Sequence, residues 1–368
     1  MKLKYPVYQP SLHGNEKKYV MECLDSTWIS SKGKFINQFE ESFSEYLGIK
    51  YSAAVSNGTV ALHAALLVLG IGKGDEVIVP TFTYIASVNS IRYTDAVPVF
   101  VDSKEDTWQM DPEEVKKKIT SKTKAVMAVH LYGHICEMDE LVKICNEHNL
   151  YLIEDTAEAF GSKYKGKFAG TFGDISTFSF FGNKTITTGE GGIVSTNSKE
   201  LYDLIVRLKG QGLAAGKEYF HDIIGYNYRM TNICAAIGCA QLENATGIIT
   251  KKREIANWYN NQLNDLPLQL HKESKDVYHT YWMYTVMVND AEKRDMLRTF
   301  LKENGIETRP AFHPVHQMPM YYKEGASFPV AESMALKGIN LPSYPELSES
   351  DVEYICKTIN RFYKPFIV

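Results

Sequence analysis

The sequence predicts an α/β protein with a large, mostly parallel β-sheet and a smaller α+β unit in its C-terminal part. Two observations support this prediction. Short apolar runs alternate with helical patterns from about residue 51 onward, which is typical of a parallel sheet covered on both faces. A long helical pattern at 231–263 then separates this alternation from a different mixture of strand and helix. We therefore expect a large domain at 1–245, including the N-terminal segment, and a small domain at 246–368.

The composition supports an ordinary globular protein of about two domains, since the chain has 368 residues, 44% of them hydrophobic and 23% charged. The net charge of −4 gives no basic footprint for nucleic acid. The six cysteines form no CxxC pair, which favours reduced thiols over a disulfide framework or a zinc site. No stretch resembles a signal peptide or reaches membrane-spanning length. We expect a soluble, cytoplasmic protein without a metal.

The elements follow one another in a regular order after an irregular N-terminal region that holds one helix, at 15–25. We expect strands at 76–80, 98–102, 124–131, 150–155, 176–181 and 193–196. We expect helices at 60–70, 84–93, 111–120, 138–149 and 199–210. Between 210 and 230 no periodic pattern is present, and we expect a loop there.

The C-terminal part begins with the long helix over 231–263, which we expect to bridge the two domains. A strand-like run at 281–288 and a helix at 293–305 follow, and then a proline-rich loop at 309–319. A closing helix is expected at 348–363.

The stretch SFFGNKTITTGEGG contains the most informative lysine of the chain. A buried strand ends at a Gly-Asn turn that presents Lys184, and a cluster of glycines follows. Burial disfavours the ammonium form, and a lysine with a lowered pKa is the nucleophile that forms Schiff bases. The alternative is a solvated loop lysine beside a glycine hairpin, which burial frequencies favour for a lone lysine.

Three further features lie where ligands bind in open α/β sheets, beyond the carboxyl ends of strands. Asp155 ends a strand and could pair with a ring nitrogen of a cofactor or cap the next helix. Gly58 and Thr59 begin a helix, where phosphate binds well, although an ordinary N-cap is the alternative. Tyr84 follows a strand and could stack on a flat cofactor or belong to the core.

Taken together, these blocks resemble the DegT-type nucleotide-sugar aminotransferases, which are fold type I pyridoxal phosphate enzymes with an aspartate aminotransferase-like fold. The resemblance spans essentially the whole chain. The matching blocks are SNGTVALHAAL, GDEVIVPTFTYIAS, VHLYGH, IEDTAEAFG, SFFGNKTITTGEGG, GYNYRMTN and RPAFHPVH.

The resemblance implies a role for each matching position. Lys184 would form the Schiff base with pyridoxal 5'-phosphate and move the proton, and Asp155 would pair with the pyridinium nitrogen. Tyr84 would stack on the ring, while Gly58, Thr59 and Ser179 would hold the phosphate. Two further cofactor contacts are implied. Glu158 would lie at the ring edge, where relatives often carry glutamine or histidine, and Asn227 would reach the phosphate from a neighbouring subunit. The implied contacts to the nucleotide sugar are Trp28, Ser30, Ser31, Arg229, His313 and His316.

The implied reaction is amino transfer from glutamate to C4 of GDP-4-keto-6-deoxymannose, for the synthesis of a cell-surface polysaccharide such as O-antigen. The implied partners are a second copy of the chain, in a homodimer with shared sites, and these small molecules. Alternatives are a UDP- or dTDP-linked sugar, amination at C3, or a regulatory protein that senses a ligand with this fold. Lys184 argues against the related 3-dehydratases, which carry histidine at this position.

Overall fold

The computed structural model describes residues 3–364, and its centre is a seven-stranded sheet with the strand order β1-β9-β8-β5-β4-β2-β3. Its strands are β1 (Tyr51–Val55), β2 (Glu76–Pro80), β3 (Val97–Val101), β4 (Thr123–Val129), β5 (Tyr151–Asp155), β8 (Ile175–Ser179) and β9 (Gly192–Thr196). β9 runs antiparallel to both of its neighbours, whereas all other pairings are parallel. The predicted mostly parallel sheet is confirmed, with small shifts at the ends of the six expected strands, and β1 was not predicted.

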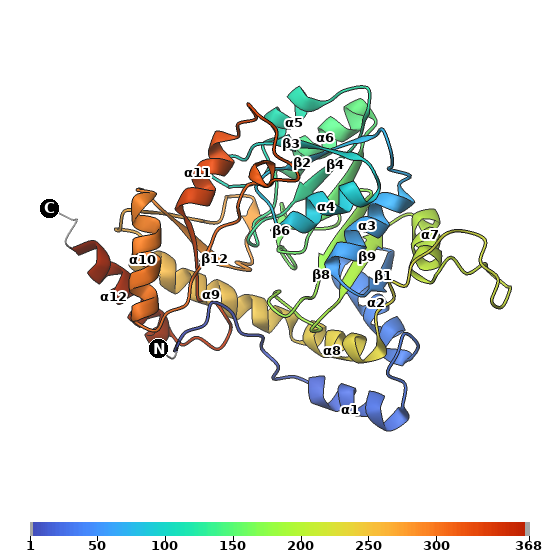
Figure 1. Cartoon of the computed structure of the whole chain (residues 1–368). Helices are drawn as coiled ribbons and strands as arrows, with labels where there is room; N and C mark the ends of the chain where they lie inside the picture. The colour runs from blue at the N-terminus through green and yellow to red at the C-terminus, as the bar shows by residue number, and fades with distance from the viewer. Residues whose placement is uncertain (1–2, 365–368) are drawn as a thin grey trace.

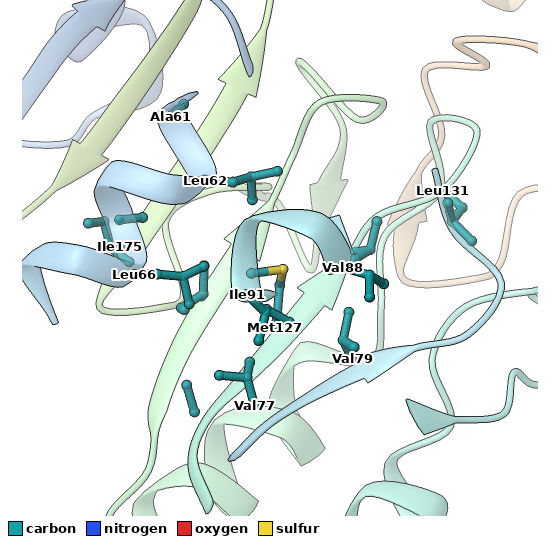
Figure 2. Close-up of a cluster of buried hydrophobic side chains, with 14 of the residues drawn as sticks. Ala61, Leu62, Leu66, Val77, Val79, Val88, Ile91, Met127, Leu131 and Ile175 are labelled. Atoms are coloured by element: carbon teal, nitrogen blue, oxygen red, sulfur yellow. The ribbon is translucent and has the colours of Figure 1, made fainter. Parts of the chain in front are cut away.

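Both faces of this sheet are covered, and successive side chains of each strand point to opposite faces. One strand therefore contributes to two core clusters. Val77 and Val79 of β2 join one core cluster, while Ile78 between them joins another. Helices α3 (Gly58–Val68), α4 (Ile85–Tyr93) and α7 (Lys199–Lys209) pack on the first side. Figure 2 shows part of this core, where Leu62 and Leu66 face Val77, Val79 and Met127.

The opposite face is covered in two halves. Helices α5 (Pro112–Lys118) and α6 (Met138–His148) pack over one half, and α2 (Lys34–Leu47) and α8 (Asn232–Glu243) over the other, with α1 (Glu16–Ser26) against α8. The sequence prediction missed α2, although Phe35, Phe39, Phe43 and Leu47 recur at helical spacing and are all buried.

A second sheet of four strands, ordered β10-β12-β14-β13, lies in the C-terminal part. Its strands are β10 (Leu268–Leu270), β12 (Tyr284–Val288), β13 (Arg309–Pro310) and β14 (Gly338–Leu341), with α9 (Ala245–Leu263), α10 (Glu292–Glu303), α11 (Pro329–Lys337), α12 (Glu349–Tyr363) and the 3-10 turn η1 (Val315–Gln317) around it. A three-stranded sheet joins β11 (Val277–Tyr278) to β6 (Lys163–Tyr164) and β7 (Lys167–Phe168). In Figure 1, α9 runs from α8 toward α10 and α12. The predicted division at residues 245 and 246 stays a prediction.

Two expected elements differ from the structure. The helix expected over 231–263 is two helices, since α8 ends at Glu243 and Asn244 adopts φ −100° and ψ 2° before α9. The Asn244 side chain bonds the Ala240 carbonyl at 3.5 Å, and such local bonds compete with helix propagation. The strand expected over 281–288 begins only at Tyr284, because Tyr281 has a positive φ of 51° and Trp282 bonds a distant loop.

The loop expected over 210–230 contains no helix or strand, and it projects beyond α7 in Figure 1. Isolated bridges join Gly210 to Asn227 and Leu213 to His221, so the loop folds back on itself. Among residues 3–364, no helix is both long and apolar enough to cross a membrane.

Candidate active site

A cavity of about 630 Å³ opens at the carboxyl ends of β4, β5 and β8, next to the first turns of α3 and α4. This is the edge where ligands bind in open α/β sheets. Seven of the eight predicted cofactor contacts line it: Gly58, Thr59, Tyr84, Asp155, Glu158, Ser179 and Lys184. Side chains that sequence reasoning did not single out complete the wall, among them Ser87, Asn183, Trp282 and Phe312.

The turn that carries Lys184 is held from two sides. Its backbone N–H donates to the carbonyl of Phe181 at 2.9 Å, which closes the turn after β8. The indole Nε1 of Trp282 donates to the Asn183 carbonyl at 2.7 Å, and the hydroxyl of Tyr8 donates to the carbonyl of Lys184 itself. Contacts from the N-terminal segment and from the segment before β12 therefore place this lysine, and no local sequence signal identifies either partner.

The Lys184 ammonium is in an apolar and acidic environment. Its side chain is 13% exposed, its Nζ lies 4.1 Å from the ring centre of Trp282, and Oε1 of Glu158 is 3.8 Å away. Burial lowers the pKa of Lys184, and the charges of Glu158 and Asp155 oppose this shift. Because the side chain is enclosed, the alternative of a solvated loop lysine does not describe this residue.

Asp155 ends β5 and is buried, with 4% of its surface exposed. Its Oδ2 accepts a hydrogen bond from the Ser87 hydroxyl at 2.7 Å, and its Oδ1 accepts one from the Ala157 backbone at 3.2 Å. Burial raises the pKa of Asp155, while these hydrogen bonds and Lys184 counteract the rise. Residues 156–162 form turns rather than a helix, so Asp155 caps no helix there.

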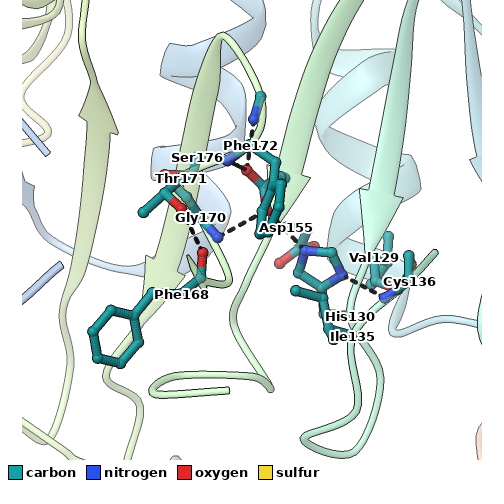
Figure 3. Close-up of polar contacts among 12 residues, drawn as sticks. Val129, His130, Ile135, Cys136, Asp155, Phe168, Gly170, Thr171, Phe172 and Ser176 are labelled. Carbon is teal, nitrogen blue, oxygen red and sulfur yellow. Dashed lines mark hydrogen bonds and ion pairs between the residues drawn. The ribbon is translucent and has the colours of Figure 1, made fainter. Parts of the chain in front are cut away.

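A buried polar network supports the end of β5 behind Asp155. The carboxylate of Glu154 accepts bonds from the backbone of Gly170 at 2.8 Å and of Phe172 and Gly173 at 2.7 Å each. The His130 Nε2 completes it at 3.1 Å, while its Nδ1 accepts from the Cys136 backbone at 3.2 Å (Figure 3). Since the buried carboxylate has partners on both oxygens, the network fixes the strand end that presents Asp155.

The N-terminus of α3 offers an anion site. Asn57 caps the helix by accepting from the Val60 backbone at 3.0 Å, so the N-cap interpretation holds for Asn57 and leaves Gly58 and Thr59 on the cavity wall. A side chain at Gly58 would place its Cβ 2.7 Å from Cβ of Ser179. Only glycine therefore permits this close approach of the helix start to the Ser179 hydroxyl.

The side chain of Tyr84 lies at the start of α4 and is 57% exposed, so it is not a core residue. Its ring centre is 6.0 Å from that of Phe312, and both line the cavity. An exposed aromatic face at a cavity wall is available for stacking on a flat ligand.

These walls fit pyridoxal 5'-phosphate. The cavity combines an anion-binding helix start, a buried carboxylate, an exposed aromatic face and a buried lysine with a lowered pKa. The buried Asn183 Oδ1 has no hydrogen-bond partner among the described residues and is therefore available to a polar ligand. The missing side chain at Gly58 leaves room for such a ligand.

The remaining predicted residues lie outside this wall in the single chain. Arg229 donates to Oδ1 of Asn227 at 3.2 Å, near the end of the loop over 210–230. Trp28 is exposed and lines a separate hollow near Lys34. Ser30 and Ser31 follow it, and His313 is exposed.

His316, in contrast, is buried. Its Nδ1 bonds the Thr81 hydroxyl at 2.7 Å and its Nε2 bonds Glu332 at 3.1 Å. With both nitrogens engaged, His316 ties the proline-rich loop to the end of β2.

The chain was compared with known proteins. The family model of the DegT/DnrJ/EryC1/StrS aminotransferase family matches residues 10–360. The chain is 63% identical to a GDP-perosamine synthase of Escherichia coli O157:H7 over 362 residues, which cover 98% of this chain and 99% of that protein. It is 54% identical to the GDP-perosamine synthase of Vibrio cholerae, over 97% of this chain and 99% of that protein.

Among solved structures, the pyridoxal phosphate form of a putative sugar aminotransferase, Spr1654 of Streptococcus pneumoniae, superposes with a TM-score of 0.94. It is 27% identical, and the match covers 100% of both chains. The similarity of fold therefore extends over the whole chain.

Proposed function

The chain belongs to the DegT/DnrJ/EryC1/StrS aminotransferase family, and from this premise we propose that it transfers the amino group of glutamate to C4 of GDP-4-keto-6-deoxymannose, giving GDP-perosamine and 2-oxoglutarate. The observation that carries the proposal is the enclosed Lys184, which shares one cavity with Asp155 and the start of α3. The identity of 63% to a GDP-perosamine synthase supports this particular substrate.

Pyridoxal 5'-phosphate supplies the aldehyde and the electron sink that amino transfer needs. Gly58, Thr59 and Ser179 would hold its phosphate, Tyr84 its ring face and Glu158 its ring edge. Asp155 would hold the proton on the ring nitrogen, because an ionised carboxylate favours the protonated ring.

Lys184 would take the proton from the donor carbon and return it to the acceptor, with its Nζ as the proton-carrying atom. The low exposure of this amine excludes water from that transfer.

We further propose that the active unit is a homodimer in which Asn227 of one subunit reaches the phosphate site of the other. Asn227 does not line the cavity of its own chain, which supports a contact to the cavity of the other subunit. The substrate contacts proposed for Trp28, Ser30, Ser31, Arg229 and His313 belong to the same shared site. His316 is not among them, because it is buried and both of its ring nitrogens are bonded within the chain. A fully active monomer in light scattering would contradict the shared site. The proposed setting is cytoplasmic synthesis of O-antigen or a similar polysaccharide.

The test is glutamate-dependent turnover with 4-keto-6-deoxysugars linked to GDP, UDP and dTDP, with Lys184→Ala as the inactive control. A site that hydrogen-bonds the guanine amine leaves buried groups unpaired when the base lacks it, which can reduce kcat/KM by a factor of about 10⁴. We expect the GDP-linked sugar to be strongly preferred. Comparable kcat/KM for a dTDP-linked sugar would contradict the guanine assignment, and activity of Lys184→Ala would contradict the mechanism.

A further inference from the structure

Glu158 stands out among the buried carboxylates because it faces a buried amine instead of a full set of hydrogen-bond donors. Its Oε2 accepts from the Tyr132 backbone at 3.0 Å, and its Oε1 has the Lys184 Nζ 3.8 Å away. Glu158 is 4% exposed. The neighbouring Glu154, in contrast, has three backbone donors and a histidine.

The other charged groups around this pair are already engaged. Asp155 already accepts one hydrogen bond on each oxygen, from the Ser87 hydroxyl and from the Ala157 backbone. The phenol of Tyr132 interacts electrostatically with Glu158, and burial raises the pKa of this phenol well above its usual value, so that it stays neutral. Glu158 is therefore the carboxylate in position to exchange a proton with Lys184.

The energetics of the pair favour such an exchange. Burial raises the pKa of Glu158 to about 7, against the opposing effect of Lys184. Burial also lowers the pKa of Lys184. When the pKa of the acid rises and the pKa of the base falls, the charged pair and the neutral pair become closer in free energy. A proton can then move between the two side chains at little cost.

We propose that Glu158 is the acid–base partner of Lys184, which stores the proton whenever the amine has to be free and returns it afterwards. One N–H bond breaks at Nζ and one O–H bond forms at Oε1, so that an ammonium and a carboxylate become an amine and a carboxylic acid. No further reactant is needed. The separation of 3.8 Å closes to hydrogen-bond length by a small rotation of either side chain. This inference rests on the proposed aminotransferase function.

The variant Glu158→Gln tests it, because glutamine keeps the size and the acceptor for the Tyr132 backbone but stores no proton. In the apoprotein, added pyridoxal 5'-phosphate is trapped with borohydride at a series of pH values, and label on Lys184 is quantified by mass spectrometry. Losing the nearby negative charge makes the ammonium less favourable, so the midpoint of labelling should move down by about one pH unit or more. Glu147→Gln, on the exposed side of α6, is the matched control.

The glutamate half-reaction provides the decisive second readout. A carboxylate that acts only by its charge would leave Glu158→Gln equally fast or faster at low pH, since more amine is free. A proton store predicts the opposite, a rate lower by a factor of about 10²–10⁴ with little change in glutamate affinity. A half-reaction within threefold of the wild type would overturn the proposal.

Glu158→Asp keeps an exchangeable proton on a shorter side chain and guards against a folding defect in the glutamine variant. The half-reaction of Glu158→Asp should be slower than that of the wild type but should depend on pH in the same way. Loss of this pH dependence would contradict the proposal. The trapping experiment separates the two levels of inference. Absence of label on Lys184 in the wild type would contradict the proposed function, whereas normal labelling with an unchanged profile in Glu158→Gln would contradict only the role of Glu158.

Discussion

The ionisation of Asp155 depends on one neighbouring hydroxyl, that of Ser87 in the first turns of α4. The Ser87 hydroxyl donates to Oδ2 at 2.7 Å and counteracts the effect of burial on the pKa of Asp155. Ser87 was not predicted from the sequence, yet a signal existed, since it lies one helical turn after Tyr84 and thus on the same face. Its partner Asp155 lies on another strand, and only the fold brings them together.

We predict that Ser87→Ala weakens pyridoxal 5'-phosphate binding about tenfold or more, because a hydrogen bond to a charged group contributes about 1.5–3 kcal/mol. The acid limb of the pH–rate profile should also move to higher pH, since the pKa of Asp155 rises further without the donor. Ser87→Thr should restore both properties. Titration of the apoprotein with cofactor and a pH–rate profile measure these effects.

Ser90→Ala is the matched control, because Ser90 is equally buried on the same helix and its hydroxyl bonds the Ser87 carbonyl at 2.9 Å. Equal losses in both variants would mean that α4 as a whole, rather than the Ser87 hydroxyl, sets the affinity.

At the level of elements, the periodicity of apolar residues predicted those helices and strands whose formation depends mainly on local sequence. Six of the seven strands of the large sheet are short apolar runs that were predicted within small end shifts, whereas β1 was not predicted. The two-residue strands β6, β7 and β11 are too short for any pattern, and their pairing is set by tertiary contacts. The break at Asn244 was equally hidden, because one asparagine in a helical pattern is tolerated in many helices.

The junction of β8 and α3 yields an element-scale prediction. Gly58→Ala would put a Cβ 2.7 Å from Cβ and 3.0 Å from Oγ of Ser179, and push the helix start from the strand. Overpacking of this kind costs about 1–3 kcal/mol. We expect a roughly five- to hundredfold weaker cofactor affinity, with little change in the far-ultraviolet circular dichroism spectrum.

Gly247→Ala provides the comparison, since a Cβ at Gly247 in α9 meets nothing within 4 Å. This change should leave cofactor affinity intact and add about 0.5–1 kcal/mol of stability, because alanine favours a helix over glycine. If Gly58→Ala binds the cofactor as tightly as Gly247→Ala, the close approach at α3 is not needed for the phosphate site.

At the scale of the molecule, contacts between distant parts decide how the site is built, and the sequence did not predict them. Tyr5 packs in the C-terminal core and bonds Asp351 at 3.0 Å, which anchors the N-terminal segment there. Tyr8, three residues on, then reaches the carbonyl of Lys184. The family resemblance predicted which residues form the cavity, but the supports of Lys184 come from both ends of the chain.

Two buried histidines, His279 and His271, connect the C-terminal part to Thr107, and a third, His134, lies beside them. The Tyr281 backbone donates to Nδ1 of His279 at 2.9 Å, and the His279 Nε2 donates to Nδ1 of His271 at 3.4 Å. The His271 Nε2 then donates to the carbonyl of Thr107 at 2.9 Å, near the large sheet. Beside them, His134 donates from Nδ1 to a carbonyl at 2.9 Å and accepts the Ser274 hydroxyl at Nε2, at 2.8 Å. Each of the three rings has one nitrogen that accepts a hydrogen bond, and this role requires the neutral ring.

Acid should therefore weaken this junction. Burial lowers the pKa of His134 to about 4 and places those of His271 and His279 well below the usual value. Above about pH 6.5 the rings are neutral in both folded and unfolded chains, and their contribution is complete. Between about pH 6.5 and 4 the unfolded chain binds protons that the folded chain excludes, so each ring removes about 1.4 kcal/mol of stability per pH unit.

Urea unfolding between pH 7 and pH 5 measures this slope, in the apoprotein so that cofactor binding does not contribute. His134→Gln removes one titrating ring, and the free energy of unfolding should then fall less steeply with acid, by the equivalent of about one proton. His148→Gln, at the exposed end of α6, should keep the wild-type slope. If His134→Gln and the wild type lose stability in parallel, then His134 takes up its proton in the folded chain as readily as in the unfolded one, and the neutral histidine junction does not exist in solution.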